Sequence, residues 1–272
     1  MFYLILFLFI LLLLGFLYLA AIMPQLKKPA SLKILSGFRY YAHRGLHDNK
    51  SDAPENSLLA IRRAVEAGYG IELDVQLSKD GIPVVFHDFT LKRICKTNLK
   101  VSELSLSELK SLHLFSSDET IPTLEEVLAV VDGRVPLIIE YKLEGLRCDV
   151  CRISDELLSH YHGAYCIESF HPLAVYWYRK NRPQVVRGQL SSNFLREGEF
   201  SPALFLVRHL LFNFLTRPTF VAYNCIDKRS LSRTICRSLY KNLSVAWTIH
   251  SEKELADNSS NFDWFIFEGF CP

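Results

Sequence analysis

Short apolar runs rich in β-branched residues alternate along most of the chain with segments whose apolar residues recur at helical spacing. Eight strands are expected at Arg39–His43, Gly70–Gln76, Leu137–Tyr141, Tyr165–Ser169, Val185–Gln189, Phe220–Tyr223, Ser244–Thr248 and Trp264–Phe267. Helices are expected between most of them, at Ser57–Glu66, Thr123–Val131, Arg147–Tyr161, Pro172–Asn181, Pro202–Leu215, Lys228–Tyr240 and Glu252–Ala256. Strands that alternate with helices pair in parallel. Eight such units predict a TIM-type (β/α)8 barrel.

Two features depart from a plain barrel. Pro83–Phe86 reads as an extra short strand after the second one, and a polar insertion, Leu91–Ser117, follows it. No helix pattern follows the eighth strand, and the residues before the first strand are expected to cover that flank. The segment Ser201–Leu215 is unusually apolar. We expect it to be an outer helix that packs on the barrel, although a helix that touches lipid would have the same composition.

The first residues of the chain form one long apolar run. Residues 2–23 contain no charged side chain, and a helix of this length spans about 33 Å, enough to cross a hydrocarbon core of roughly 30 Å. A cleaved signal peptide would have a positive start and a shorter apolar core, neither of which is seen. We therefore predict a transmembrane helix over residues 1–23, a linker over 24–37 and one domain over 38–272.

Charge indicates the orientation and the partners. Lys27, Lys28, Lys33 and Arg39 all follow the apolar run and nothing basic precedes it, which places the large domain in the cytoplasm. The seven cysteines show no disulfide spacing, in agreement with that compartment. The formal net charge is only +2, so nucleic acid is not an expected partner, whereas the bilayer is.

Polar side chains gather near the ends of the early strands, where the catalytic groups of such barrels lie. They are His43 with Arg44, Glu72 with Asp74, His87 with Asp88, and Glu140 with Lys142. Residues two apart on a strand share a face, so each carboxylate pair or carboxylate–amine pair points in one direction. Singly, each motif is an ordinary loop or surface ion pair. Together, at successive strand ends, they predict one site.

The residue types indicate the chemistry of that site. Glu72, Asp74 and Glu140 offer hard oxygen ligands suited to a divalent metal, Mg²⁺ or Ca²⁺. The cations of Arg44 and Lys142 suit a phosphate group. His43 and His87 can act as a general acid and a general base near neutral pH. This combination predicts the hydrolysis of a phosphate diester.

The sequence resembles the glycerophosphodiester phosphodiesterase family. The matching stretches are AHRG (42–45), PENS (54–57), IELDVQLSKDGIPVVFHD (71–88), IPTLEEVL (121–128), LIIEYK (137–142) and ESFHP (168–172). The resemblance implies two catalytic histidines, His43 and His87. It implies metal ligation by Glu72, Asp74 and Glu140, and phosphate contacts from Arg44 and Lys142. One departure is the end of the eighth strand, where many relatives carry Thr-Asp-Pro and this chain has Glu268 in Phe-Glu-Gly-Phe-Cys-Pro (267–272).

The resemblance implies cleavage of glycerophosphodiesters to glycerol 3-phosphate and an alcohol, with a role in lipid metabolism. Two alternatives stay open. One is lysophospholipase D or cyclising phospholipase activity on lysophospholipids. The other is a non-catalytic, membrane-tethered binding barrel, against which the intact set of polar residues argues. Loss of hydrolysis on metal chelation would distinguish an enzyme from a binding module.

Overall fold

The structure is a computed structural model that describes residues 1–196, 198–199 and 201–272. Within these residues, eight parallel strands close into a barrel because β1 pairs with both β9 and β2. The strands are β1 (Tyr40–His43), β2 (Gly70–Leu77), β4 (Leu137–Tyr141), β5 (Tyr165–Ser169), β6 (Arg187–Ser191), β7 (Phe220–Asn224), β8 (Leu243–Ile249) and β9 (Trp264–Phe267). The predicted barrel is confirmed. The fifth parallel strand begins two residues later than predicted, at Arg187.

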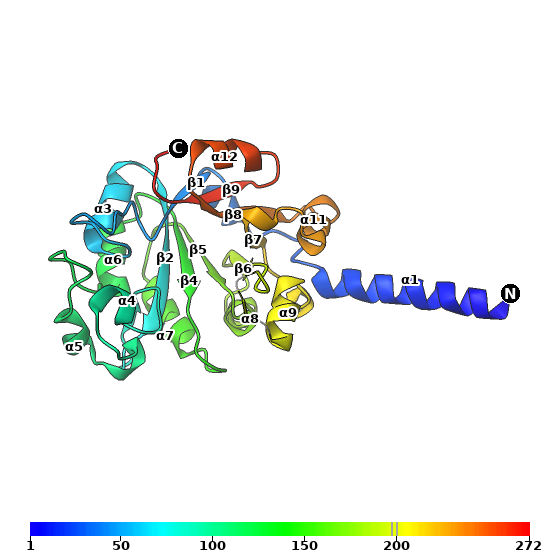
Figure 1. The fold of residues 1–272 in the computed structure, drawn as a ribbon, viewed down its shortest axis with the longest axis horizontal. Helices are drawn as coiled ribbons and strands as arrows, with labels where there is room; N and C mark the ends of the chain where they lie inside the picture. The colour runs from blue at the N-terminus through cyan, green and yellow to red at the C-terminus, as the bar shows by residue number, and fades with distance from the viewer. Residues whose placement is uncertain (197, 200) are drawn as a thin grey trace.

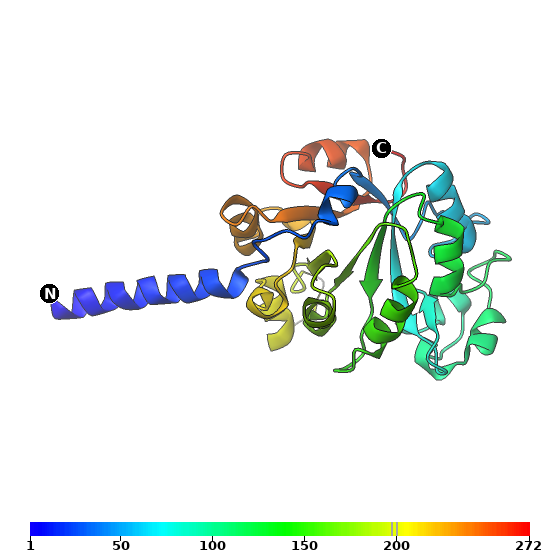
Figure 2. The ribbon, with the colours of Figure 1, turned by 180° about the vertical axis from the view of Figure 1, so that it is seen from behind.

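Helices surround the barrel on the outside (Figures 1 and 2). They are α3 (Leu58–Glu66), α6 (Leu124–Val131), α7 (Asp149–Leu158), α8 (Pro172–Asn181), α9 (Pro202–Arg208), α10 (Asn213–Thr216), α11 (Leu231–Ser238) and α12 (Glu252–Asn258), with the 3-10 turn η2 at Cys225–Asp227. Polar caps fix several starts. Ser57 accepts from the amide of Ala60, and Thr123 forms a capping box with Glu126. The apolar face of each helix then packs on the outer face of the sheet.

The segment Pro202–Leu215 is not one helix, contrary to the prediction. Helix α9 ends at Arg208, and the buried residue Leu210 takes a left-handed backbone angle, φ 57°. A left-handed residue cannot continue a right-handed helix, so the chain turns and restarts as α10. The break folds the apolar segment back against the barrel and presents two short helices in place of one long one.

The insertion after β2 has a small core of its own. Strand β3 (Pro83–Val85) runs antiparallel to β2 and is followed by α4 (Lys92–Cys95), η1 (Val101–Glu103) and α5 (Leu106–Lys110). Its buried apolar side chains are Val84, Phe86, Leu91, Ile94, Val101, Leu109, Leu114 and Ile121. The prediction of a polar insertion is therefore wrong in this respect. Its apolar residues are spaced too irregularly to be recognised as a core from the sequence.

Two helices precede the barrel. Helix α1 (Phe2–Ile22) projects away from the body, and only its last turns touch it (Figures 1 and 2). Tyr240 donates to the carbonyl of Leu19, and Asn213 donates to that of Ile22. By length and composition α1 could span a bilayer, and a signal sequence would meet the same criteria. Within residues 24–37, the short helix α2 (Leu32–Leu35) places the buried Leu35 against the inside of the barrel.

The inside of the barrel is layered. Apolar residues that include Tyr41, Ile138, Cys166 and Ile266 pack together toward the end of the barrel at which the strands begin. Because side chains alternate between the faces of a strand, the residue two positions further along points to the same interior. These positions are His43, Glu140, Glu168 and Glu268. The interior of the barrel is therefore apolar at the end where the strands begin and polar at the end where they finish. We call the polar end the barrel mouth.

Candidate active site

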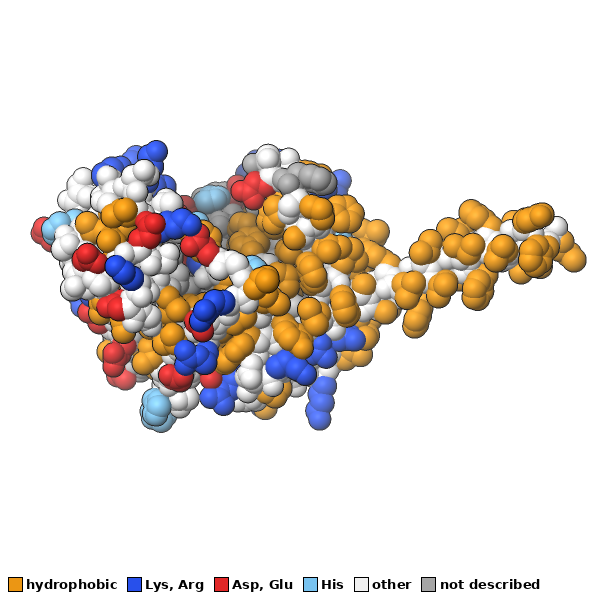
Figure 3. Space-filling model, turned by 90° about the horizontal axis from the view of Figure 1, so that it is seen from below, with side chains coloured by type: hydrophobic (Ala, Val, Ile, Leu, Met, Phe, Trp, Pro, Cys, Tyr) orange, Lys and Arg blue, Asp and Glu red, His pale blue; other side chains and the backbone are white. Residues whose placement is uncertain are grey.

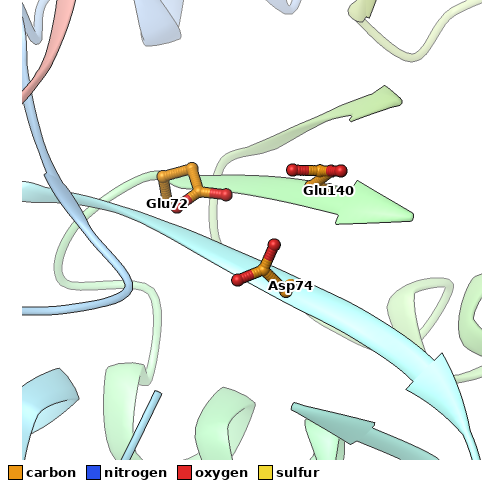
Figure 4. A group of neighbouring side chains, drawn as sticks. All are labelled: Glu72, Asp74 and Glu140. Carbon is orange, nitrogen blue, oxygen red and sulfur yellow. The ribbon is translucent and has the colours of Figure 1, made fainter. Parts of the chain in front are cut away.

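Three buried carboxylates, Glu72, Asp74 and Glu140, converge inside the mouth (Figure 4). Asp74 lies beside Glu140 in the pairing of β2 with β4. One oxygen from each residue lies within 4.8 Å of the others. All three side chains are buried, and their ligand type and spacing fit a single divalent cation. We call these residues the carboxylate cluster.

The electrostatics of the carboxylate cluster favour a cation. Burial raises the pKa of Glu72 well above its usual range, and the charges of Asp74 and Glu140 raise it further. Burial also raises the pKa of Glu140, although the Lys142 ammonium opposes the increase. In Asp74, the charges of Lys142, His87 and Arg44 outweigh burial and hold the pKa well below its usual range. Like charges this close are stabilised when a positive ion joins them.

A fourth carboxylate adds to this field. Glu168 on β5 lies beside Glu140 in the sheet, and its pKa is raised well above the usual range by burial and by the charge of Glu140. Its Oε2 atom is buried and has no hydrogen-bond partner among the described residues. An unpaired buried oxygen next to the carboxylate cluster is a further sign that a cationic or hydrogen-bonding group belongs there.

Two cations border the carboxylate cluster. Lys142 Nζ lies 3.0 Å from Asp74 Oδ1 and 2.7 Å from Glu140 Oε1. Arg44 Nη1 lies 2.6 Å from Glu55 Oε1, and its Nε is 3.5 Å from Asp74 Oδ2. Both side chains are mostly buried at the mouth, so each presents its charge in a fixed place. An anionic group such as phosphate would find two positioned cations here.

His43 is held by Glu268. The two are joined by a 2.5 Å contact between His43 Nδ1 and Glu268 Oε2, across 225 residues of sequence. With Nδ1 occupied, the Nε2 atom faces the carboxylate cluster, 3.9 Å from Glu72 Oε2. Burial lowers the pKa of His43 to about 4, despite the hydrogen bond to Glu268. The hydrogen bond to His43 in turn lowers the pKa of Glu268 to about 2.

His87 is held in a similar manner by its neighbour. Its Nδ1 atom lies 2.6 Å from Asp88 Oδ1. Arg93, from α4 in the insertion, binds Asp88 through Nε at 2.7 Å and binds Glu55 at 2.7 Å. Glu55 also binds Arg44, so a continuous chain of ion pairs joins the insertion to the barrel mouth. The charge of His87 lowers the pKa of both Asp74 and Glu140, so His87 interacts electrostatically with the carboxylate cluster.

Local backbone geometry explains the HRG and PENS motifs. Gly45 has φ 82°, and a Cβ atom there would meet the carbonyl carbon of Ala60 at 2.8 Å, so only glycine fits. Asn56 also has a positive φ, 60°, a conformation that asparagine tolerates. Its amide group donates to Asp74, and its backbone amide donates to the carbonyl of Arg44. The two motifs therefore lock together and aim Arg44 at the carboxylate cluster.

The structure brings all seven predicted site residues to one mouth. It also adds residues to which the sequence had assigned no role: Glu55, Asn56, Gln76, Arg93, Glu168 and Glu268. Gln76 shares the face of Glu72 and Asp74, and it donates to the carbonyls of Phe86 and Asp88, which fixes the loop of His87. The period of two along β2 could have identified Gln76. Arg93 showed no such pattern, because only the fold brings it to Asp88 and Glu55.

Comparisons with known proteins indicate the family of the chain. Residues 43–196 match the glycerophosphoryl diester phosphodiesterase family. A glycerophosphodiester phosphodiesterase of Bacillus altitudinis is 29% identical over 233 residues, covering 80% of this chain and 88% of the relative. A phosphodiesterase of Oleispira antarctica, solved with the product sn-glycerol-3-phosphate, is 28% identical with a TM-score of 0.67, covering 85% of this chain and 92% of that one. A glycerophosphodiester phosphodiesterase of Thermotoga maritima is 25% identical with a TM-score of 0.66, covering 85% and 94%.

Proposed function

Because the chain belongs to the glycerophosphoryl diester phosphodiesterase family, we propose that it hydrolyses glycerophosphodiesters to glycerol 3-phosphate and an alcohol at its barrel mouth. Membership in the family makes the protein a phosphodiesterase, as the strand-end motifs predicted, and not a non-catalytic barrel. The observation that carries the finer proposal is the carboxylate cluster, flanked by two cations and by two histidines that are each bound to a carboxylate.

We assign the roles as follows. Glu72, Asp74 and Glu140 would hold a divalent cation, Mg²⁺ or Ca²⁺. When bound, such an ion supplies a Lewis acid that stabilises negative charge on the phosphoryl oxygens. Arg44 and Lys142 bind the same phosphate from its flanks, since both present fixed charges beside the carboxylate cluster.

The two histidines move the protons. In each, Nδ1 is bound to a carboxylate, so Nε2 is the atom left to exchange a proton with substrate. One imidazole accepts the proton of the nucleophile, either water or the neighbouring glycerol hydroxyl. The other donates a proton to the oxygen of the leaving alcohol. His43 and His87 are the catalytic residues of this proposal, and Glu268 and Asp88 are their positioning residues.

Metal dependence tests the cofactor assignment. The purified full-length chain should release glycerol 3-phosphate from glycerophosphocholine, lose that activity with a chelator and regain it with Mg²⁺ or Ca²⁺. Binding should also raise the melting temperature, because an ion that binds only the folded state stabilises it. Asp74→Asn should abolish both responses. Full turnover in the chelator, with no thermal response to either ion, would contradict the proposal.

We also propose that α1 is a retained membrane anchor and that the barrel lies on the cytoplasmic side. The proposal keeps residues 1–23 as the span, 24–37 as the connection and 38–272 as the phosphodiesterase domain. The span carries no charge, and basic residues follow it. Among them, Lys28 donates to the carbonyl of Thr219, and Arg217 of the barrel donates to that of Met23. These bonds hold the end of the span and the connection against the barrel.

A further inference from the structure

A pocket of about 890 Å³ opens at the end of the barrel where the strands begin, opposite the barrel mouth. It is bordered by α11 and by the residues that precede β8 and β9. Six of its lining residues are basic: Lys28, Lys228, Arg229, Arg233, Arg237 and Lys241. Among the described residues that line it, Asp263 alone is acidic. We call this feature the basic pocket.

The surrounding protein leaves most of these positive charges without a carboxylate. Asp263 accepts from Arg237 at 3.2 Å and, through its other oxygen, from the backbone amide of Ser244 at 2.8 Å. The other five basic side chains form no ion pair with any carboxylate that the structure describes. The basic pocket therefore carries an excess of positive charge that an anion would balance.

Two of the guanidinium groups also have hydrogen-bond donors to spare. Arg233 is only 3% exposed. It donates to the hydroxyl of Ser244 and to the carbonyls of Lys228 and Asn261, but its Nε atom is buried and has no partner among the described residues. The same is true of Nη1 of Arg237. Buried donors of this kind need an acceptor, and an anionic oxygen is the strongest acceptor for a guanidinium group.

The pKa values of the lining residues agree with an anion site. Burial lowers the pKa of Lys28 to about 8, and burial together with the charge of Arg237 lowers the pKa of Arg233 to about 10. Lys28 donates to the carbonyl of Thr219, which is a neutral partner. A negative charge in the basic pocket would stabilise the charged form of both side chains.

The basic pocket adjoins the end of α1. Helix α11, which lines the pocket, also contacts the last turn of α1, where Cys236 donates to the carbonyl of Ile22 at 3.3 Å. Lys28 belongs to the connection that follows α1. Figure 3 shows one face of the molecule, on which apolar side chains cover the surface beside the base of α1 and Lys and Arg side chains border them. With α1 in the bilayer as proposed, α11 lies near the level of the lipid head groups.

We propose that the basic pocket binds the phosphate head group of an anionic phospholipid from the membrane that α1 enters. Anionic lipids attract basic side chains next to a membrane helix, and the fixed guanidinium groups add hydrogen bonds to phosphate oxygens. The lipid is a bound partner and not a substrate, because the carboxylate cluster lies at the opposite end of the barrel. Binding there fixes the orientation of the barrel on the bilayer. The proposal does not depend on the proposed reaction.

The test compares two lipids that share a phosphate group and differ in net charge. The full-length protein in a non-ionic detergent would be titrated with dioctanoyl phosphatidylglycerol and with dioctanoyl phosphatidylcholine, in a chelator that keeps metal from the carboxylate cluster. We expect phosphatidylglycerol to bind at least about tenfold more tightly, because each basic side chain near an anionic lipid contributes roughly a factor of five. Equal dissociation constants would overturn the proposal.

Matched variants localise the binding. Arg229→Glu combined with Lys241→Glu reverses two exposed charges of the basic pocket, so it should keep the melting temperature and remove the preference for phosphatidylglycerol. Arg62→Glu combined with Lys253→Glu makes the same change in net charge on exposed positions of α3 and α12, and it should keep the preference. Arg237→Gln removes one unpaired donor and should weaken the binding of phosphatidylglycerol alone. Equal loss of the preference in the pocket variant and in the control would contradict the proposal.

Two further measurements distinguish a membrane lipid from a soluble anion. Inorganic phosphate should bind at least about tenfold more weakly than phosphatidylglycerol. Phosphate that binds as tightly, and is lost in the pocket variant, would make the basic pocket a site for a soluble anion and overturn the lipid. In nanodiscs, phosphatidylglycerol added to phosphatidylcholine should slow hydrogen exchange of the α11 amides and leave α12 unchanged. Unchanged exchange in α11 would also overturn the proposal.

Discussion

His43 and His87 share one arrangement, in which a carboxylate binds Nδ1, and in His43 the Nε2 atom faces the carboxylate cluster. For His43 the carboxylate is Glu268 at the end of β9. The seven candidate site residues could be predicted from motifs because each lies on a strand or just after one. Glu268 could not be given its role from the sequence, because its contact with His43 spans 225 residues and needs the closed barrel.

Replacing Glu268 by glutamine tests this positioning role. The variant keeps a similar shape but loses the charge that fixes the orientation and proton position of His43. We expect kcat to fall about 10-fold or more, with KM little changed and the pH profile of kcat displaced. Steady-state kinetics across pH would measure both effects. Glu252→Gln, an exposed carboxylate on α12, is the matched control, and an unchanged kcat and pH profile for Glu268→Gln would exclude the role.

Among the elements, the insertion after β2 has the clearest connection to the site. Its helix α4 supplies Arg93, which binds both Asp88 and Glu55. The strands could be predicted because apolar runs and parallel pairing constrain each other. The core of the insertion and the break between α9 and α10 could not be predicted in this way. They depend on tertiary contacts of residues such as Ile94 and Leu210.

Glu55 should make the stability of this connection depend on pH. Burial alone raises its pKa, but the hydrogen bond from Arg93 and the charge of Arg44 outweigh it and hold the pKa at about 2, against 4.5 for a free side chain. A carboxyl with a depressed pKa stabilises the fold above its unfolded pKa and loses that effect as pH falls through the folded value. Glu55→Gln should therefore cost about 2–3 kcal/mol at pH 7.

The difference between wild type and Glu55→Gln should shrink as the pH falls from about 4.5 toward about 2. Denaturant unfolding of the full-length protein at a series of pH values would measure it. Glu125→Gln on the exposed face of α6 serves as the control. A difference that stays constant over this range would show that Glu55 acts through its shape and not through its charge.

At the scale of the whole molecule, the last turn of α1 is joined to the outside of the barrel by hydrogen bonds from Asn213 and Tyr240. The sequence predicted the helix from its length and lack of charge. The contacts at the end of this helix could not be predicted, because Asn213 and Tyr240 lie far from it in sequence and only the fold brings them to Ile22 and Leu19.

Membrane orientation can be tested with Cys271, an exposed thiol. If the barrel lies in the cytoplasm, a membrane-impermeant maleimide should label Cys271 only after right-side-out vesicles are permeabilised. Cys271→Ser should remove this signal, which identifies the labelled site. Labelling in sealed vesicles would place the barrel on the outside, and release of the protein by alkaline carbonate would contradict the anchor itself.

The most direct measurement of the central claim is the release of glycerol 3-phosphate from glycerophosphocholine by the full-length protein and by His43→Ala and His87→Ala. Each histidine is proposed to transfer a proton in the transition state, so each variant should lose about 10²- to 10⁴-fold in kcat. The folded state should be retained, as judged by the melting temperature and by its rise with Mg²⁺ or Ca²⁺. Near-wild-type turnover in both variants would contradict the assignment of this mouth as the active site.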